Sequence, residues 1–307
     1  MSVRRSLKSA AEGLLAGSGF IRLSRRWHRR RCVVLAYHNI LPDGAPAVGD
    51  RSLHLSRGDF IRQLDRLSWS HRIADLEELL ANPFDPSATQ PRAAITFDDA
   101  YRGALEVGLP ELTERGWPAT VFVAPGTLGD RAFWWDLLAD SALGEPDAGA
   151  RPRALELYRG LQDEVLRHLI PSARTDLDMP SHSRSATEHE LERAMQDHNV
   201  SFGVHTWNHP NLTRLEAGEI ITELERSLTW LEDRFPRVLP WLAYPYGLRS
   251  REVEALLTDR LAGGLTLEGG LVPRQIDPES RRRVPRVNIP AGVSLRGFDL
   301  RAAGILS

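Results

Sequence analysis

The sequence predicts an α/β fold built on a parallel β-sheet, either a barrel or a doubly wound sheet. Three observations support this prediction. Short apolar runs recur along the chain, helical segments lie between them, and polar residues follow the ends of the apolar runs. Strands that alternate with helices pair in parallel, because each helix returns the chain to the start of the next strand.

Five apolar runs are predicted to be buried strands, because they are short, apolar and rich in β-branched residues. They are CVVLAY (32–37), AAITF (93–97), ATVFV (119–123), SFGVH (201–205) and WLAYP (241–245). Weaker strand candidates lie around Ile73, Gly263 and Val287. Helical periodicity and suitable caps predict helices over 56–67, 101–116 and 216–235.

One region interrupts this alternation. Residues 129–189 are helical in character but irregular, and include FWWDLLADSAL and RALELYRGLQDEVLRHLI. We interpret them as an insertion between two strands; in a barrel, such an insertion would lie over the carboxyl-terminal mouth, where active sites occur. The expected organisation is a basic helical arm (1–31) followed by one barrel domain (32–307) with an insertion at about 129–189.

Composition and charge exclude several classes of protein. The chain has 307 residues, 42% of them hydrophobic and 26% charged, as in ordinary folded proteins. Its net charge of -2 gives no indication of a nucleic-acid partner. Cys32 is the only cysteine, so an intramolecular disulfide and a cysteine-based zinc cluster are excluded, and a buried apolar role is expected.

The first 31 residues are strongly basic, with Glu12 as their only acidic residue. Their apolar residues recur at helical spacing, which fits a helix packed on the domain or a helix lying on an anionic membrane surface. We favour the packed helix. No apolar run matches a signal peptide or a membrane span, so the expected location is cytoplasmic, with peripheral membrane contact through the arm as the alternative.

Titratable residues follow the predicted strands. They are His38 after the first strand, Asp98 and Asp99 after the second, and His205 with His209 after SFGV. In parallel α/β folds these strand ends gather on one rim. Two histidines and one aspartate form a three-ligand set that leaves positions open on a catalytic metal. Taken alone, each histidine could equally be a surface or capping residue.

Three motifs occur together in a fixed order. TFDDAY (96–101), HTWNHPNL (205–212) and AYPYG (243–247) follow LAYHNI (35–40). Together they resemble the polysaccharide deacetylases of carbohydrate esterase family 4, the NodB-homology group, in the branch with an N-terminal Tyr-His element. The resemblance covers about residues 33–289 and is weakest over 129–189. It implies a distorted (β/α)7-type barrel with a helical insertion, and metal-dependent hydrolysis of an N-acetyl group on an amino sugar.

The resemblance also implies roles for individual residues. A divalent ion would be held by Asp99, His205 and His209. Asp98 would be the general base, and the backbone N–H of Tyr246, in the turn formed with Pro245, would donate to the oxyanion. Histidine and aspartate ligands suit Zn²⁺, and Co²⁺ or Ni²⁺ would also fit.

The sequence departs from the family pattern at two positions. Ala243 stands where many members have an arginine that orients the catalytic aspartate, and no histidine follows His209 to act as the usual general acid. We predict that Arg286 pairs with Asp98 or binds substrate, a solvated arginine being the alternative. We predict that His38 protonates the leaving amine, because imidazole exchanges protons readily near neutral pH. A purely structural histidine is the alternative.

The expected function is a metal-dependent deacetylase acting on N-acetylated sugars of a polysaccharide, a glycan precursor or a glycolipid. Trp134, Trp135 and Trp207 are candidates to stack on sugar faces, with core packing expected for at least one. His54 is assigned to a loop. Two alternative functions stay open: an esterase or deformylase acting on an acylated sugar, and a catalytically silent carbohydrate-binding protein.

Overall fold

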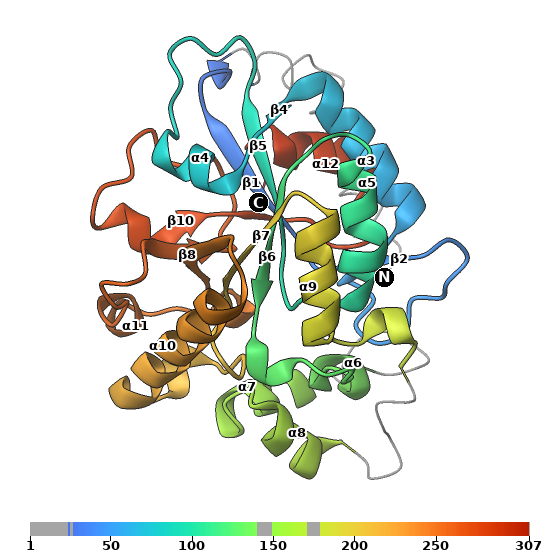
Figure 1. Cartoon of the computed structure of the whole chain (residues 1–307), viewed down its shortest axis with the longest axis vertical. Helices are drawn as coiled ribbons and strands as arrows, with labels where there is room; N and C mark the ends of the chain where they lie inside the picture. Colours follow the sequence, from blue (N-terminus) through green and yellow to red (C-terminus); the bar gives the residue numbers. More distant parts are fainter. Residues whose placement is uncertain (1–23, 25–26, 140–148, 171–178, 307) are drawn as a thin grey trace.

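A single parallel sheet forms the centre of the computed structural model, which describes residues 24, 27–139, 149–170 and 179–306 (Figure 1). In spatial order, its strands are β10 (Val284–Pro285), β9 (Gly263–Thr266), β8 (Val238–Ala243), β7 (Val200–Val204), β6 (Ala119–Val123), β5 (Arg92–Phe97), β1 (Cys32–Tyr37) and β11 (Val287–Asn288). The short β4 (Arg72–Ile73) also pairs with β5. A separate pair joins β2 (Asn39–Leu41) to β3 (His54–Ser56).

The two ends of this sheet are consecutive in the chain. β10 pairs with β9 at one edge and β11 pairs with β1 at the other, and only Arg286 separates β10 from β11. The segment 284–288 therefore closes the sheet into a barrel. The predicted distorted (β/α) barrel is confirmed, and the doubly wound alternative is wrong.

Helices cover the outside of the barrel (Figure 1). They are α3 (Arg57–Ser70), α4 (Leu76–Ala81), α5 (Leu109–Thr113), α9 (Glu188–Asp197), α10 (Ala217–Arg234), α11 (Arg251–Ala255) and α12 (Leu295–Ala302). Their starts are fixed by side chains: Ser56 accepts from Asp59 N, and Thr187 with Glu190 forms a capping box. The predicted helix over 101–116 begins as a short π-helix (Ala104–Gly108) and then continues as α5.

Side chains alternate between the two faces of the sheet. Along β1, Val33 and Leu35 pack in a cluster with most of the covering helices, whereas Cys32 and Val34 pack with Phe122 and the leucines of α4 in a second cluster. This period of two is what a strand imposes. Cys32 is buried, as expected from its sequence.

The described part of the predicted insertion contains α6 (Trp134–Leu138), α7 (Ala150–Leu157) and α8 (Gln162–Leu169). They lie together at the lower end of the molecule in Figure 1, beyond the carboxyl end of β6. Short helical turns occupy Pro125–Thr127, Ser181–Ser183, Leu212–Arg214, Pro245–Gly247 and Ser280–Arg283.

Most of the predicted basic arm lies outside the described residues. Of its later part, Ser24 donates to Ala303 O and Arg31 donates to Val272 O. Among the residues that the structure describes, no helix combines the length and apolarity needed to cross a bilayer.

Candidate active site

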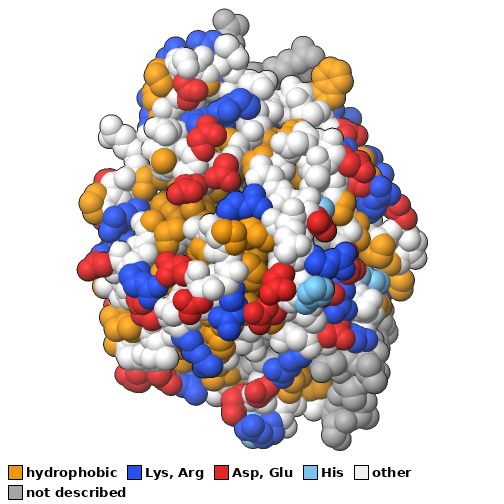
Figure 2. Space-filling model, viewed as in Figure 1, with side chains coloured by type: hydrophobic (Ala, Val, Ile, Leu, Met, Phe, Trp, Pro, Cys, Tyr) orange, Lys and Arg blue, Asp and Glu red, His pale blue; other side chains and the backbone are white. Residues whose placement is uncertain are grey.

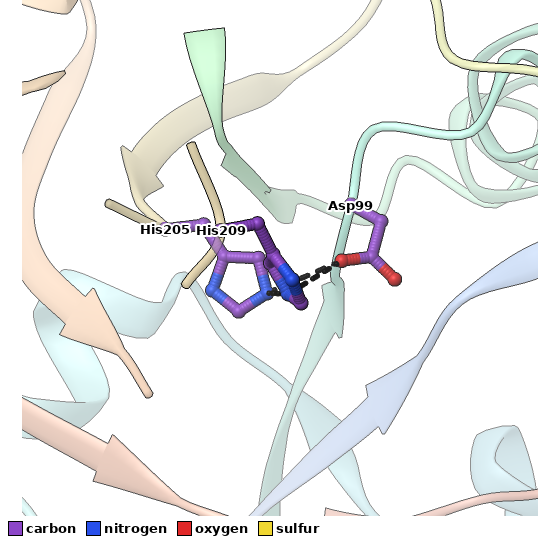
Figure 3. Close-up of side chains that lie close together, drawn as sticks. All are labelled: Asp99, His205 and His209. Atoms are coloured by element: carbon purple, nitrogen blue, oxygen red, sulfur yellow. Dashed lines mark hydrogen bonds and ion pairs between the residues drawn. The ribbon is translucent and has the colours of Figure 1, made fainter. Parts of the chain in front are cut away.

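Three ligand-type side chains converge at the carboxyl end of the barrel (Figure 3). Asp99 follows β5, and His205 and His209 lie in the loop that leaves β7. Asp99 Oδ1 lies 3.3 Å from His205 Nε2 and 3.1 Å from His209 Nε2, and the two Nε2 atoms are 3.0 Å apart. Bonds of 2.0–2.1 Å in a tetrahedral zinc site separate neighbouring ligand atoms by roughly 3.3 Å. The set therefore has the dimensions of a metal site.

Hydrogen bonding around this set also fits a bound cation. His205 Nδ1 donates to Ala243 O at 2.7 Å, which leaves the Nε2 lone pair directed at the other ligands. Asp99 Oδ1 is buried and makes no well-formed hydrogen bond, although both imidazoles are close. A buried carboxylate oxygen without a donor is costly, and a cation held by the three residues would satisfy it.

Burial and neighbouring charges set the protonation of these ligands. Burial raises the pKa of Asp99, but the imidazoles of His209 and His205 close to its carboxylate outweigh it, so the pKa lies well below its ordinary value. Burial lowers the pKa of His209, whereas the pKa of His205 is raised, because the neighbouring carboxylates of Asp99 and Asp98 outweigh its burial. An ionised carboxylate and a neutral imidazole are the forms in which these side chains bind metals.

Unusual backbone conformations cluster at the same place. Of the seven described non-glycine residues with positive φ, five lie here: Asp99 (70°), Ala100 (52°), Thr206 (66°), His209 (55°) and Tyr246 (58°); the other two, Asp130 and Arg159, lie in the insertion. This left-handed region is sparsely populated, and such residues gather at functional sites. The HTWNH segment thus forms a turn leaving a strand, as predicted.

Asp98 is held by the arginine at the barrel closure. Arg286 Nη1 and Nη2 donate to the two carboxylate oxygens of Asp98 at 2.7 and 2.8 Å. Arg286 also donates to Thr96 Oγ1 and lies over the ring of Phe122, with no exposed surface. The predicted pairing with Asp98 is confirmed. A fully buried side chain fits neither the solvated alternative nor direct contact with substrate.

Arg286 also determines the charge of Asp98. Burial raises the pKa of this carboxyl, but the positive charge of Arg286, followed by that of His205, lowers it to below its ordinary value. Asp98 is therefore ionised at neutral pH. Arg286 fills the electrostatic role left vacant by Ala243, although it reaches Asp98 from a different strand.

A cavity of about 180 Å³ opens over these residues. Pockets for drug-sized ligands usually measure about 300–1,000 Å³, so this space suits a small group such as one acylated sugar unit. Its lining includes Asp98 and the three ligand residues, together with His38, which is half-buried after β1. The structure thus brings His38 into the same cavity as Asp98. Its role as the acid remains a prediction.

The turn that follows β8 forms another wall of the cavity. Pro245 is buried, and Tyr246 packs its ring against His209 with centroids 4.5 Å apart. The Tyr246 hydroxyl lies 3.0 Å from Gly160 O and accepts from Trp134 Nε1. This side chain ties the insertion to the HTWNH loop; donation from the Tyr246 N–H to an oxyanion remains a prediction.

The three tryptophans differ in their surroundings. Trp134 is completely buried, so its role is core packing, as expected for at least one of the three. Trp135 is largely buried but lines the cavity, with its ring 5.0 Å from that of His209. Trp207 lies beneath the guanidinium of Arg226 and is absent from the cavity lining.

His54 is not a loop residue, contrary to the prediction. It lies buried in β3, where its Nδ1 accepts from Asn39 and its Nε2 donates to Asp136 Oδ1 at 3.0 Å. Tyr101 donates to Asp136 Oδ2 and accepts from Trp135 Nε1, both at 2.7 Å. This buried network fixes Trp135 beside the metal ligands.

Sequence reasoning missed Asp136, Tyr101 and Arg151. Arg151 lines the cavity and donates to Asp50 Oδ2 at 2.7 Å. Arg151 comes from an irregular helical region that carried no motif. Asp136 resembles an ordinary acidic residue in the first turn of a helix. Tyr101 is the last residue of the TFDDAY motif, and the motif alone gave it no separate role.

Solved structures with the same fold are known. The Streptococcus pyogenes deacetylase PplD in complex with acetate is 18% identical, with a TM-score of 0.61 over 89% of this chain and 98% of that one. IcaB from Ammonifex degensii is 18% identical, with a TM-score of 0.59 over 89% and 97%. BC0361, a polysaccharide deacetylase from Bacillus cereus, is 16% identical, with a TM-score of 0.61 over 87% and 67%. At these identities, the likeness shows a shared fold.

The family of the chain follows from its sequence, because the solved structures show only a shared fold. No curated protein matches the chain at a significant level. A family model described as polysaccharide deacetylase matches residues 85–260, which is more than half of the chain and contains Asp98, Asp99, His205, His209 and Tyr246. The chain therefore belongs to the polysaccharide deacetylase family, whose members are hydrolases.

Proposed function

We propose that the protein removes N-acetyl groups from amino sugars of a polysaccharide, a glycan precursor or a glycolipid, and that it uses a divalent metal ion, Zn²⁺ suiting the ligands best. The observation that carries this proposal is the convergence of Asp99, His205 and His209 beside the ionised Asp98 in one cavity. A protein that only bound sugar would not need a base beside a metal set.

The metal would be held by Asp99, His205 and His209. When bound, a divalent ion acidifies a water molecule and polarises the acetyl carbonyl. The remaining chemistry falls to side chains and backbone of this chain.

Asp98 is placed to accept the proton of the attacking water. Both of its oxygens bond Arg286, yet each keeps a second lone pair for an incoming proton. The bidentate contact fixes the carboxylate plane and keeps it ionised, so the base is oriented before substrate arrives.

Tyr246 and His38 supply the other two groups that the reaction needs, a donor to the oxyanion and an acid for the leaving amine. The backbone N–H of Tyr246 donates to the oxygen on which negative charge develops. His38 gives a proton to the amide nitrogen as the C–N bond breaks, so acetate and the free amine leave. Its place in the cavity lining supports this assignment.

The test measures bound metal and acetate release from N-acetylglucosamine oligomers, with wild-type protein and with Asp98→Asn. We expect equal metal content, with acetate release reduced by about 10²- to 10⁴-fold in the variant. Metal binding without turnover on any acylated sugar would indicate a carbohydrate-binding protein. Release from O-acetylated or N-formylated sugars alone would indicate the esterase or deformylase alternative.

A further inference from the structure

The end of the barrel opposite the catalytic cavity carries a cluster of arginines. Arg29, Arg30, Arg31 and Arg274, with Trp27 and Phe84, line a surface hollow of about 400 Å³, here called the arginine patch. The guanidinium of Arg274 lies over the ring of Phe84. Arg31 immediately precedes β1, so the patch surrounds the point at which the first strand begins.

Among the described residues, no acidic side chain pairs with the arginines of this patch, whereas Arg57 and Arg102 elsewhere pair with acids. On the face shown in Figure 2, basic and acidic side chains are interspersed. Asp85 lies next to Phe84, but its carboxylate accepts from the backbone and hydroxyl of Ser87.

Like-charge repulsion within the patch is visible in two pKa values. Burial lowers the pKa of His28, and the charges of Arg31 and Arg274 lower it further. Burial also lowers the pKa of Arg31, with the charge of Arg274 as the next cause. An anion bound among these groups would relieve the repulsion.

Two tryptophans at the same end are left in water. Trp27 is 77% exposed and Trp69, near the end of α3, is 88% exposed. Ser24 and His71, which lie close to them in sequence, hydrogen-bond the adjacent carbonyls of Ala303 and Ala302. Figure 1 shows α3 ending at the upper end of the molecule, where β1 begins, and α6 to α8 lying at the lower end.

We propose that this end of the barrel binds the surface of a membrane containing anionic phospholipids, with the arginine patch on lipid phosphates and Trp27 and Trp69 at the interface. Tryptophan is enriched at membrane–water interfaces, where its ring is partly apolar and its N–H stays hydrated. Clustered arginines add electrostatic attraction to anionic headgroups. The strongly basic residues 1–26 precede the patch directly in sequence and would add to that attraction.

A soluble phosphate compound shares the headgroup chemistry but explains less. It would occupy the arginines without using the exposed indoles, and it would have no need of the basic sequence beside the patch. The patch also lies apart from the substrate cavity, because the six residues of β1 separate them by roughly 20 Å. Membrane contact at this end leaves the cavity open to the aqueous phase.

The experiment sediments the full chain with vesicles of phosphatidylcholine alone or with about 30 mol% phosphatidylglycerol. The patch variant is Arg29→Gln with Arg30→Gln and Arg274→Gln. The matched control removes the same charge from exposed arginines on α3, α9 and α11, as Arg62→Gln with Arg193→Gln and Arg251→Gln. A third variant combines Trp27→Ser with Trp69→Ser. Equal melting temperatures verify that each variant is folded.

We expect binding only to the anionic vesicles, weakening as salt is raised. The patch variant should lose about 100-fold in partition coefficient, since each arginine near an anionic surface contributes about fivefold, and the control should stay close to wild type. The indole variant should lose binding at every salt concentration. Equal losses in the patch and control variants, or no loss in the patch variant, would overturn the proposal. The proposal would also be overturned if pyrophosphate released the protein from the vesicles and sodium chloride of equal ionic strength did not, because that result would identify a soluble phosphate site.

Discussion

At the scale of single residues, Asp98 and Arg286 form a buried ion pair in the active site. The two side chains are almost entirely excluded from water and share a bidentate contact. Removing one partner of such a pair typically costs about 3–5 kcal/mol, because the other charge stays buried and unpaired. The pair therefore affects both the stability of the protein and the proton affinity of Asp98.

Replacing Arg286 should move the acid side of the pH profile. In Arg286→Gln, burial still raises the pKa of Asp98 but the opposing charge is gone, so the base becomes protonated at a higher pH than in wild type. We expect the acid limb of kcat/KM to shift upward in pH, together with lower stability. The control is Arg283→Gln, which removes a half-buried arginine paired with the exposed Glu279. An acid limb that does not move would assign Arg286 a structural role only.

His38 can be tested through the leaving group. His38→Ala should reduce acetate release from N-acetylated sugars by about 10²- to 10⁴-fold while leaving the metal content unchanged. Because an aryl oxide leaves without protonation, hydrolysis of an aryl acetate should change much less. Near-full turnover of the amide by the variant would remove His38 from the mechanism.

At the scale of elements, the buried hydrogen bonds of Tyr101 join the barrel to the insertion. Tyr101→Phe leaves Asp136 Oδ2 and Trp135 Nε1 without this partner. We expect a loss of about 1–3 kcal/mol in the free energy of unfolding, measured by urea denaturation. KM should rise as well, since Trp135 lines the cavity. Tyr158→Phe, at a half-buried tyrosine that stacks on His168, is the control and should change neither quantity by much.

The elements themselves were largely predictable from local sequence. The apolar strands at 32–37, 93–97 and 119–123 and the capped helices α3 and α10 carry their signals within a few residues. The proximity of the polar residues at the strand ends could also be predicted, because parallel strands end on one rim of the barrel. These signals placed Asp98, Asp99, His205 and His209 together.

What could not be predicted depends on contacts between distant segments. Asp136 meets His54 across 82 positions and the N–H of Asp50 across 86. Such pairing has no local signal, so the sequence around His54 resembled a loop, and nothing in the sequence distinguished the buried Trp134 from the cavity-lining Trp135. The barrel closure at 284–288 rests on two strands of only two residues each, too short to show a periodic pattern.

At the scale of the whole molecule, metal binding should be coupled to folding. The ligands come from two loops that the complete barrel holds together, so an ion that binds only the folded chain stabilises it by RT ln(1 + [M]/Kd), about 2.7 kcal/mol at 100 Kd. We expect Zn²⁺ to raise the melting temperature and a chelator to lower it. His209→Ala should abolish the zinc-dependent rise, and His189→Ala, at an exposed histidine, should keep it. A rise that persists in His209→Ala would place the ion elsewhere.

Arg286 lies in the segment that closes the barrel, and this segment is synthesised long after Asp98. Asp98 is made first, and the arginine that neutralises it follows 188 positions later. Until β10 and β11 dock on opposite edges of the sheet, Asp98 lacks the partner that fixes its charge and orientation. We therefore expect a nascent chain that ends before Arg286 to be inactive even with both aspartates and both histidines in place, and activity to arise in the same step that completes the sheet.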